Sequence, residues 1–387
     1  MSELYIGRGK DEDNASLIRF LDEVFFWDST CGTNFLGLLP KIYKDRYRPA
    51  YNNFVVQEPG GAYRAAVGNF DCDLIVGGAE IKACCIGNVA VGKEYRSMGY
   101  MIRLMEESIA DMKARGVDLS YLGGQRQRYA YFGYEYAGTS YEFGFSRASY
   151  RHALGNIPSG LKMEKLDAGD TESVRAIDAI YTKSPIHALR KADEYYDVLR
   201  SWEDVPYVIK ENGSFVGYAV QDPNSGNVCE FGFTDDALLP RFVAAVFENT
   251  EKDSIDFSIA PYEIEKLAFF SPNASGMRIE HNEHILILNF RKVLAAYLTA
   301  KTTYEKLCDG EITVLIHGKT GDESLRVRVS DNIPEVTPFD GEARYEFDAL
   351  EAVRVFFSNF PSDRSVLPPE VRQWLPLPMY FSSRDTM

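Results

Sequence analysis

The spacing of hydrophobic and polar residues predicts alternating strands and helices in the first 148 residues. A helix is expected to begin at Asn14 or Ser16, and an amphipathic helix over residues 101–115 is expected to end at Gly116. Strands are predicted at residues 54–57, 63–67, 74–76, 81–91 and 119–122, and the mostly apolar run at 81–91 is typical of a strand buried inside a sheet. The apolar positions at helical spacing in the second helix are Met101, Leu104, Met105, Ile109 and Met112.

The same order of elements is predicted again, more weakly, in residues 149–283. The Asn212-Gly213 pair supplies a tight turn, which is a strong hairpin signal. Asp235 and Asp236 follow the last strand of this unit, and two carboxylates there would repel a phosphate. The expected elements are a helix at 171–181, a hairpin at 207–210 and 215–220, a strand at 228–233 and a helix at 238–247.

Residues 284–387 form a third block with its own pattern. Strand 325–329 alternates apolar residues with arginines, which predicts one buried face and one charged face. We therefore predict an α/β (α+β) fold with domains at residues 1–148, 149–283 and 284–387. The other elements expected in the third block are a strand at 285–288, a helix at 291–301, a strand at 312–316 and a helix at 349–357.

Composition and charge narrow the class of partner. The chain has 387 residues and a formal net charge of −15, which disfavours nucleic acid and favours a cationic small molecule such as an amine. Many proteins without such a ligand are also acidic, so the charge alone does not identify a partner.

The six cysteines show no metal-binding spacing and are expected to be reduced thiols. Neither a signal peptide nor an apolar run of about 18 residues is visible, so we expect a cytoplasmic protein without a membrane partner.

One segment carries candidate chemistry, residues 88–101. A buried strand ending at Val89, Ala90 and Val91 leads through Arg96 and Gly99 to the start of a helix. A helix start offers unpaired N–H groups and a positive dipole end, which suit a pyrophosphate. The edge of the strand can bind an extended amide-bearing arm by strand addition. A single glycine before a helix is also typical of an ordinary turn, so the spacing alone leaves both interpretations open.

The segment Arg96-Ser97-Met98-Gly99-Tyr100-Met101 resembles the acyl-CoA signature of the GNAT acetyltransferases, Arg/Gln-x-x-Gly-x-Gly/Ala, with Met101 in place of a small residue. Residues 119–124 and 128–135 resemble the strand and the tyrosine-bearing segment of that superfamily. The whole chain is similar to the enhanced-intracellular-survival (Eis) family. That resemblance implies a catalytic GNAT domain, a degenerate second GNAT-like domain and a C-terminal domain with a sterol-carrier-protein-like fold.

The resemblance also implies a reaction. Acetyl-CoA is the expected acyl donor, no metal is expected, and an amine would attack the thioester directly within a ternary complex. Backbone N–H groups at residues 89–91 would polarise the thioester carbonyl. Tyr129 matches the family's general acid, and the C-terminal carboxylate, here that of Met387, would accept the amine's proton. Tyr129 is also one of 24 tyrosines, and chain ends often fray. The resemblance further implies a homo-oligomer, such as a hexamer.

Trp27 and Asp28 are candidates for an amine pocket, because an indole face and a carboxylate both attract a cation. Core packing of Trp27 and helix capping by Asp28 are the alternatives. Two other functions stay open: an acyl-CoA- or lipid-binding protein, and an inactive scaffold with the same folds. A metalloenzyme or a serine hydrolase is disfavoured, because the sequence has neither an HExxH nor a GxSxG motif.

Overall fold

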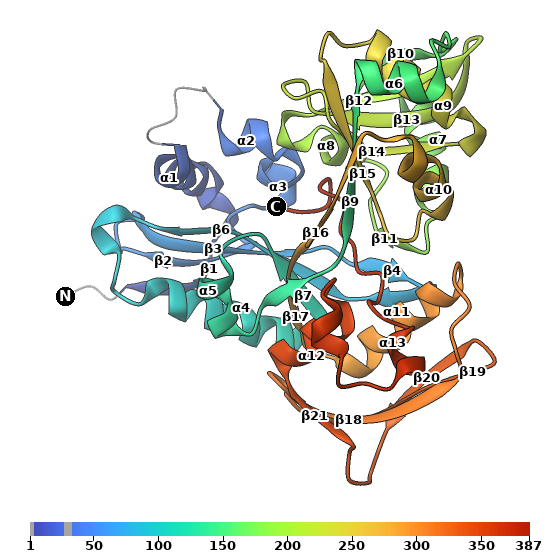
Figure 1. Cartoon of the computed structure of the whole chain (residues 1–387). Coiled ribbons are helices and arrows are strands. Elements are labelled where there is room, and N and C mark those ends of the chain that lie inside the picture. The colour runs from blue at the N-terminus through green and yellow to red at the C-terminus, as the bar shows by residue number, and fades with distance from the viewer. Residues whose placement is uncertain (1–3, 27–32) are drawn as a thin grey trace.

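The computed structural model describes residues 4–26 and 33–387, and it confirms the α/β class. The first part contains a seven-stranded sheet in which only β6 and β7 run parallel. Helices α1 (Asn14–Phe26), α2 (Phe35–Leu38) and α3 (Pro40–Tyr43) cover one face, and α4 (Tyr100–Arg115) covers the other (Figure 1). In order across the sheet, the strands are β1 (Tyr5–Arg8), β2 (Asn53–Gln57), β3 (Tyr63–Asp71), β6 (Ala83–Val91), β7 (Leu119–Leu122), β17 (Glu283–Ile287) and β8 (Glu135–Ala137).

The local predictions in this part are confirmed closely. Helix α4 ends where Gly116 adopts a left-handed conformation, with φ of 68°, and returns hydrogen bonds to the last turn. Its apolar stripe, including Leu104, Met105 and Met112, is buried against the sheet. The short helix α5 (Arg126–Tyr129) is the next element after β7 in the chain.

The second part has a sheet of the same kind, in which only β14 and β15 run parallel. Helices α6 (Arg147–Leu154), α9 (Leu239–Glu248) and α10 (Ile264–Asn273) pack on one face, and α7 (Thr171–Tyr181) and α8 (Tyr195–Leu199) pack on the other. In order, the strands are β10 (Lys162–Lys165), β12 (Val205–Glu211), β13 (Ser214–Gln221), β14 (Val228–Phe233), β15 (Ser254–Ile259), β9 (Ser140–Ser146) and β16 (Gly276–Glu280).

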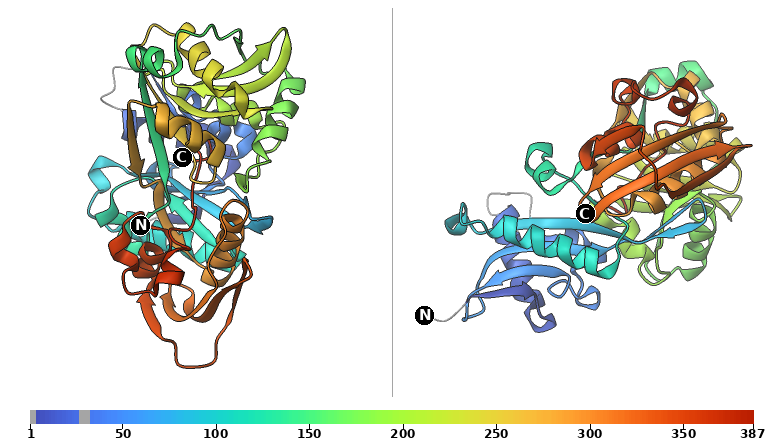
Figure 2. Two further views of the ribbon diagram at one scale, coloured as in Figure 1. Left: turned by 45° about the vertical axis from the view of Figure 1, so that its right-hand side comes forward. Right: turned by 90° about the horizontal axis from the view of Figure 1, so that it is seen from below.

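The third part is a four-stranded sheet covered on one face by helices (Figures 1 and 2). In β19, the predicted alternation is confirmed, since Leu325, Val327 and Val329 are buried while the intervening arginines are exposed. The sterol-carrier-like identity of this part stays a prediction. Its elements are β18 (Gly310–Gly318), β19 (Gly321–Ser330), β20 (Ile333–Pro338), β21 (Tyr345–Asp348), α11 (Phe290–Thr302), α12 (Ala349–Phe357) and α13 (Pro369–Arg372).

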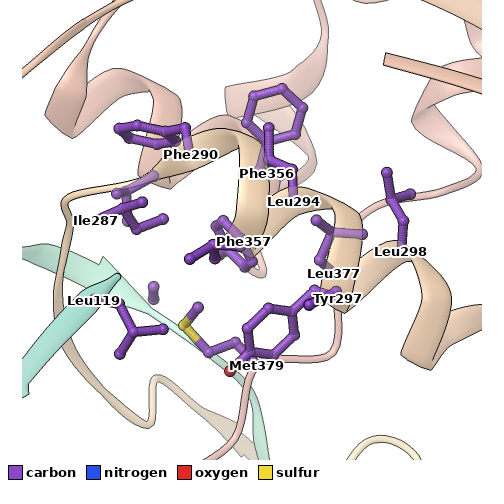
Figure 3. Packing of buried hydrophobic residues seen from close by; sticks show 14 of the residues in the cluster. Leu119, Ile287, Phe290, Leu294, Tyr297, Leu298, Phe356, Phe357, Leu377 and Met379 are labelled. Carbon is purple, nitrogen blue, oxygen red and sulfur yellow. The ribbon is translucent and has the colours of Figure 1, made fainter. Parts of the chain in front are cut away.

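One large core joins the third part to the first. Figure 3 shows Leu119 of β7 and Ile287 of β17 facing the aromatic and aliphatic side chains of α11, α12 and the C-terminal segment. The apolar residues of that segment, including Trp374 and Met379, are buried in this core. The remaining elements are the small sheet of β4 (Leu74–Val76), β5 (Ala79–Ile81) and β11 (Ile186–Ala188), and the 3-10 helices η1 (Asp11–Asp13), η2 (Asp45–Tyr47), η3 (Lys93–Tyr95), η4 (Ala130–Phe132), η5 (Ser201–Glu203), η6 (Asp236–Leu238) and η7 (Pro361–Arg364).

Strands cross between the parts, so the sheets do not follow the predicted chain divisions. Strand β9 precedes the division at 148/149 but lies in the second sheet. The strand expected to open the third domain is β17, and it lies in the first sheet between β7 and β8. Its residues Ile285, Leu286 and Ile287 are at most 1% exposed. A strand covered on both faces is mostly apolar wherever it pairs, so the pattern predicts the strand but not its partners.

Candidate functional site

A gap opens in the first sheet where β6 and β7 diverge. The two strands pair only at Ala83↔Leu119, Cys84↔Ser120 and Cys85↔Tyr121. Strand β6 continues to Val91 with β3 as its partner on the other side. Over residues 86–91, therefore, the side of β6 that faces β7 has no strand partner in the described part of the chain. Its backbone N–H and C=O groups on that side are available to a ligand.

A local irregularity turns β6 at the gap. Asn88 has φ of 38°, and the pairing with β3 shifts register between Ala66 and Gly68. The Asn88 side chain is held in place, since its amide donates to Asn53 Oδ1 at 2.7 Å and its Oδ1 accepts from the Tyr43 hydroxyl at 2.8 Å. Bulges of this kind bend and twist a strand, and the bend in β6 lies where β6 separates from β7.

The loop after β6 leaves the start of α4 open. Arg96, Ser97 and Met98 are exposed, and Gly99 precedes the helix with φ of 80° and no side-chain cap. A Cβ built on Gly99 has no atom within 4 Å, and the first turn of α4 contains no acidic residue. Because the first N–H groups of a helix have no intrahelical partner, this end can bind an anion.

The methionine that departs from the acyl-CoA signature does not occupy this space. Met101 and its neighbour Tyr100 pack, partly buried, against the core between α4 and the sheet. The Tyr100 hydroxyl accepts a hydrogen bond from Arg64 at 3.0 Å. Val89 and Val91 pack in the same core, while Ala90 faces α1 on the opposite side of the sheet.

Tyr129 lies at the end of β7, on the α4 side of the sheet. It is 6% exposed and belongs to the same buried core as Leu122 and Ile86. Gly124 makes room for its ring, since a Cβ there would lie 2.5 Å from Tyr129 Cε2. Burial raises the pKa of Tyr129, although Arg128 opposes the shift, so the phenol keeps its proton at neutral pH.

The chain end lies at the gap, on the opposite face of the sheet. A Cβ built on Gly87 would lie 3.4 Å from Met387 Cβ, and a backbone hydrogen bond from Met387 reaches the Cys85 thiol. Figures 1 and 2 show the C-terminus at the centre of the molecule, near α3 and the second sheet. The residues of β6 alternate accordingly, since Cys85 and the Cα of Gly87 face Met387, while the side chains of Cys84 and Ile86 face α4.

The last residues are anchored rather than frayed. Arg384 is 2% exposed and pairs with Asp204 at 2.7 Å, and Asp385 pairs with the buried Arg190 at 2.8 Å. Lys41 donates to the carbonyl of Thr386 at 2.6 Å. Burial lowers the pKa of Lys41 to about 8, and the charge of Asp385 partly offsets this effect. Each of these partners precedes the tail residue it binds by 180 residues or more, so no local pattern indicates them.

A separate cleft of about 560 Å³ lies beside the loop that follows β6. Side chains of α1, including Phe20 and Glu23, line it together with Tyr63, Tyr95 and Arg96. Neither Tyr129 nor Met387 lines this cleft, so it adjoins the loop rather than the point where the strands diverge.

Trp27 and Asp28 lie outside the described residues. In residues 4–26 and 33–387, no group of three or more His, Cys, Asp or Glu side chains could hold a metal ion. Within the same ranges, none of the helices combines the length and apolar character needed to cross a bilayer.

Comparison with known proteins bears on this site. Residues 6–137 match the model of a family described as an acetyltransferase (GNAT) domain. That segment contains the gap, the loop around Gly99 and Tyr129, whereas Met387 and β17 lie outside it. No curated protein matches the sequence.

Three solved structures resemble the chain over nearly its whole length. A GCN5-related N-acetyltransferase from Kribbella flavida is 17% identical, with 98% of this chain and 100% of that one covered at a TM-score of 0.67. A probable N-acyltransferase from Enterococcus faecalis (14% identical, TM-score 0.68) and Eis1 from Mycobacterium abscessus (14% identical, TM-score 0.61) each cover 98% of both chains. At such identities the likeness establishes the shared fold and does not by itself identify a function.

Proposed function

We propose that this protein is an acyl-CoA-dependent N-acyltransferase that transfers an acetyl group from acetyl-CoA to a primary amine. The observation that carries the proposal is the unpaired edge of β6, which leads to the open N-terminus of α4. The match of residues 6–137 to an acetyltransferase domain supports it.

The acyl donor would lie along this edge. Residues 89–91 would hydrogen-bond the amides of its pantetheine arm, as an added strand does. The N–H groups of residues 97–101 would bind the diphosphate, and Arg96 would add a positive charge. The left-handed backbone at Gly99, with open space where a Cβ would lie, fits close approach of a phosphate.

The groups at the gap suit direct transfer. N–H groups of β6 would stabilise negative charge on the thioester oxygen as the amine attacks. The amine nitrogen bonds to the acyl carbon, the carbon–sulfur bond breaks, and the sulfur leaves with the electron pair. Tyr129 would protonate that sulfur, and the Met387 carboxylate would face the amine and draw off its proton. The two groups approach from opposite faces of the sheet.

The acceptor is proposed to be a cationic amine, because the chain carries a net charge of −15. Trp27 and Asp28 remain candidates for its pocket, and a cyclic homo-oligomer such as a hexamer remains part of the proposal. The buried packing of Trp374, Leu375 and Met379 weighs against their use as a lipid site.

Two measurements on the purified full chain test the proposal. Calorimetry should detect binding of acetyl-CoA, and a panel of polyamines, aminoglycosides and peptides should release free CoA thiol from it. Binding without turnover on any amine would favour the inactive scaffold. Absence of binding at millimolar acetyl-CoA would refute the proposed function altogether.

A further inference from the structure

A carboxylate from outside residues 6–137, the segment that matches the acetyltransferase family model, lies at the same gap. Glu283 is the first residue of β17. This strand belongs to the first sheet, although it is far from the other strands of that sheet in the sequence. It pairs with Ala137 of β8, and its Oε2 lies 3.7 Å from where a Cβ would stand on Gly123. Gly123 directly follows β7, so the carboxylate lies at the end of β7, where the gap opens.

The carboxylate of Glu283 has no hydrogen-bond or ion-pair partner among the described residues. Neither a hydrogen bond nor an ion pair links it to them, whereas the buried Glu135 pairs with Arg126 and Arg354 at 2.5 Å each. Glu230 is likewise paired with Arg190, at 2.7 Å. Glu283 is partly buried. Carboxylates in such places are normally paired, and an unpaired one costs stability when it is ionised. Burial raises the pKa of Glu283 to about 8.

Glu283 and the chain end approach the same thiol. The charge of Glu283 acts on Cys85, and the backbone of Met387 makes a hydrogen bond to the Cys85 sulfur. Cys85 is the last β6 residue paired with β7. The two carboxylates therefore lie on the Cys85 side of the sheet, at the point where the strands diverge.

The environment of Glu283 suits a proton acceptor. A terminal carboxylate ordinarily has a pKa of about 3.5, which makes it a weak base toward an attacking amine. General bases work best when their pKa lies near the operating pH. A partly buried carboxylate without a side-chain partner, such as Glu283, meets this requirement.

We infer that Glu283, rather than the Met387 carboxylate, is the group that accepts the acceptor amine's proton, and that the Met387 carboxylate orients the amine. This inference rests on the proposed function. As the nitrogen bonds to the acyl carbon, its proton passes to the Glu283 carboxylate, directly or through one water. The departing sulfur takes the proton of Tyr129. Solvent then removes the proton from Glu283 and returns one to Tyr129, so the protein ends each cycle unchanged.

The test compares Glu283→Gln with the wild type across pH, using a weakly basic amine that stays neutral throughout. Burial is the cause of the raised pKa of Glu283, and the other titratable groups that interact with its neighbour Cys85 include Lys41, Tyr43, Cys72, Cys84 and Tyr121. In the wild type, kcat/KM should rise with pH to a plateau above about 8. In Glu283→Gln this rise should disappear and the plateau should fall by roughly 10²-fold. The affinity for acetyl-CoA should not change.

Two further variants make the result specific. Glu283→Asp should keep the pH-dependent rise at a lower rate. Glu142→Gln is the matched control, because Glu142 is another partly buried carboxylate with a raised pKa, but it bonds to Ser140 and Ser258 in the second part. It should leave the profile unchanged.

The inference and the proposed function fail in different ways. If the wild type turns over an amine and Glu283→Gln keeps both its rate and its pH dependence, the inference is wrong and the proposed function stands. A folded Glu283→Gln that is slower by the same factor at every pH, with the rise intact, would make Glu283 structural and also overturn the inference. If the wild type releases no thiol with any amine, both are lost.

Discussion

The two large sheets each contain one parallel pair of strands that diverges, and the two gaps differ in what fills them. In the first sheet, β6 separates from β7 and leads through Gly99 to the uncapped start of α4. In the second sheet, β14 and β15 pair only at Val228↔Phe257 before they separate. The backbone therefore provides the same kind of opening twice.

The second opening is closed to an anionic ligand by the protein's own groups. The Asp235 side chain accepts a hydrogen bond from the Ala237 N–H at 2.9 Å, and Asp236 lies beside it. Lys266 is 7% exposed and donates to the Phe231 carbonyl of β14 at 2.5 Å. A cavity of about 310 Å³ remains there, lined by Lys266 but also by Glu230, Asp236 and Glu263. Space at a diverging strand pair is thus not sufficient, because the side chains determine whether a phosphate is attracted.

The largest effect is expected from the end of the chain, whose last residue, Met387, lies at the first gap. Deleting residues 385–387 should abolish turnover, since it removes the terminal carboxylate from Gly87. It should also lower the free energy of unfolding by about 2 kcal/mol, because the buried Arg190 loses its hydrogen bonds to Asp385 but keeps those to Glu230. Thiol release and urea unfolding measure the two effects.

A two-glycine extension after Met387 is the matched variant. It moves the carboxylate but keeps the pair between Asp385 and Arg190, so turnover should fall while stability stays near that of the wild type. Full activity in the extended chain would show that the terminal carboxylate has no role.

Tyr129→Phe should give the next largest loss. Removing the phenol proton should lower kcat by roughly 10²-fold or more and leave acetyl-CoA affinity near the wild-type value. Tyr131→Phe is the control, because Tyr131 is 66% exposed on the adjoining 3-10 helix. Equal rates in the wild type and Tyr129→Phe would exclude the phenol as the proton donor.

The two ends of α4 offer a smaller, closely matched test. Gly99 and Gly116 have φ of 80° and 68°, and a Cβ on either one meets no atom within 4 Å. Alanine at each should therefore cost about 1 kcal/mol of stability through backbone strain. Only Gly99→Ala should also weaken acetyl-CoA binding, by about 10-fold, because its methyl group would enter the space proposed for the diphosphate. Equal affinities in the two variants, measured by calorimetry, would place the diphosphate elsewhere.

The strand and the helix at the first gap could be predicted from the sequence, but the distant residues that complete the gap could not. The period of the apolar residues in α4 and the left-handed Gly116 are local features, as is the apolar run of β6. The gap also depends on β17 and Met387, which follow Cys85 by about 200 and 300 residues. The period of apolar residues does not indicate which strand an apolar segment will pair with. The sequence around an acidic residue such as Glu283 likewise does not show whether its carboxylate will lack a partner. The roles of Tyr129, Met387 and the loop around Gly99 stay predictions until the variants are measured.

The smallest effect is expected in the second gap. Asparagine caps a helix start about as well as aspartate, so Asp235→Asn should keep the hydrogen bond to Ala237 and change stability by less than about 0.5 kcal/mol. It also removes one of the two negative charges. We nevertheless expect calorimetry to give one acetyl-CoA per chain in both the wild type and this variant, because Lys266 still occupies the Phe231 carbonyl that an added strand would need. A second equivalent bound by Asp235→Asn would mean that charge alone separates the two gaps. A second equivalent in the wild type would mean that neither the carboxylates nor Lys266 closes the second one.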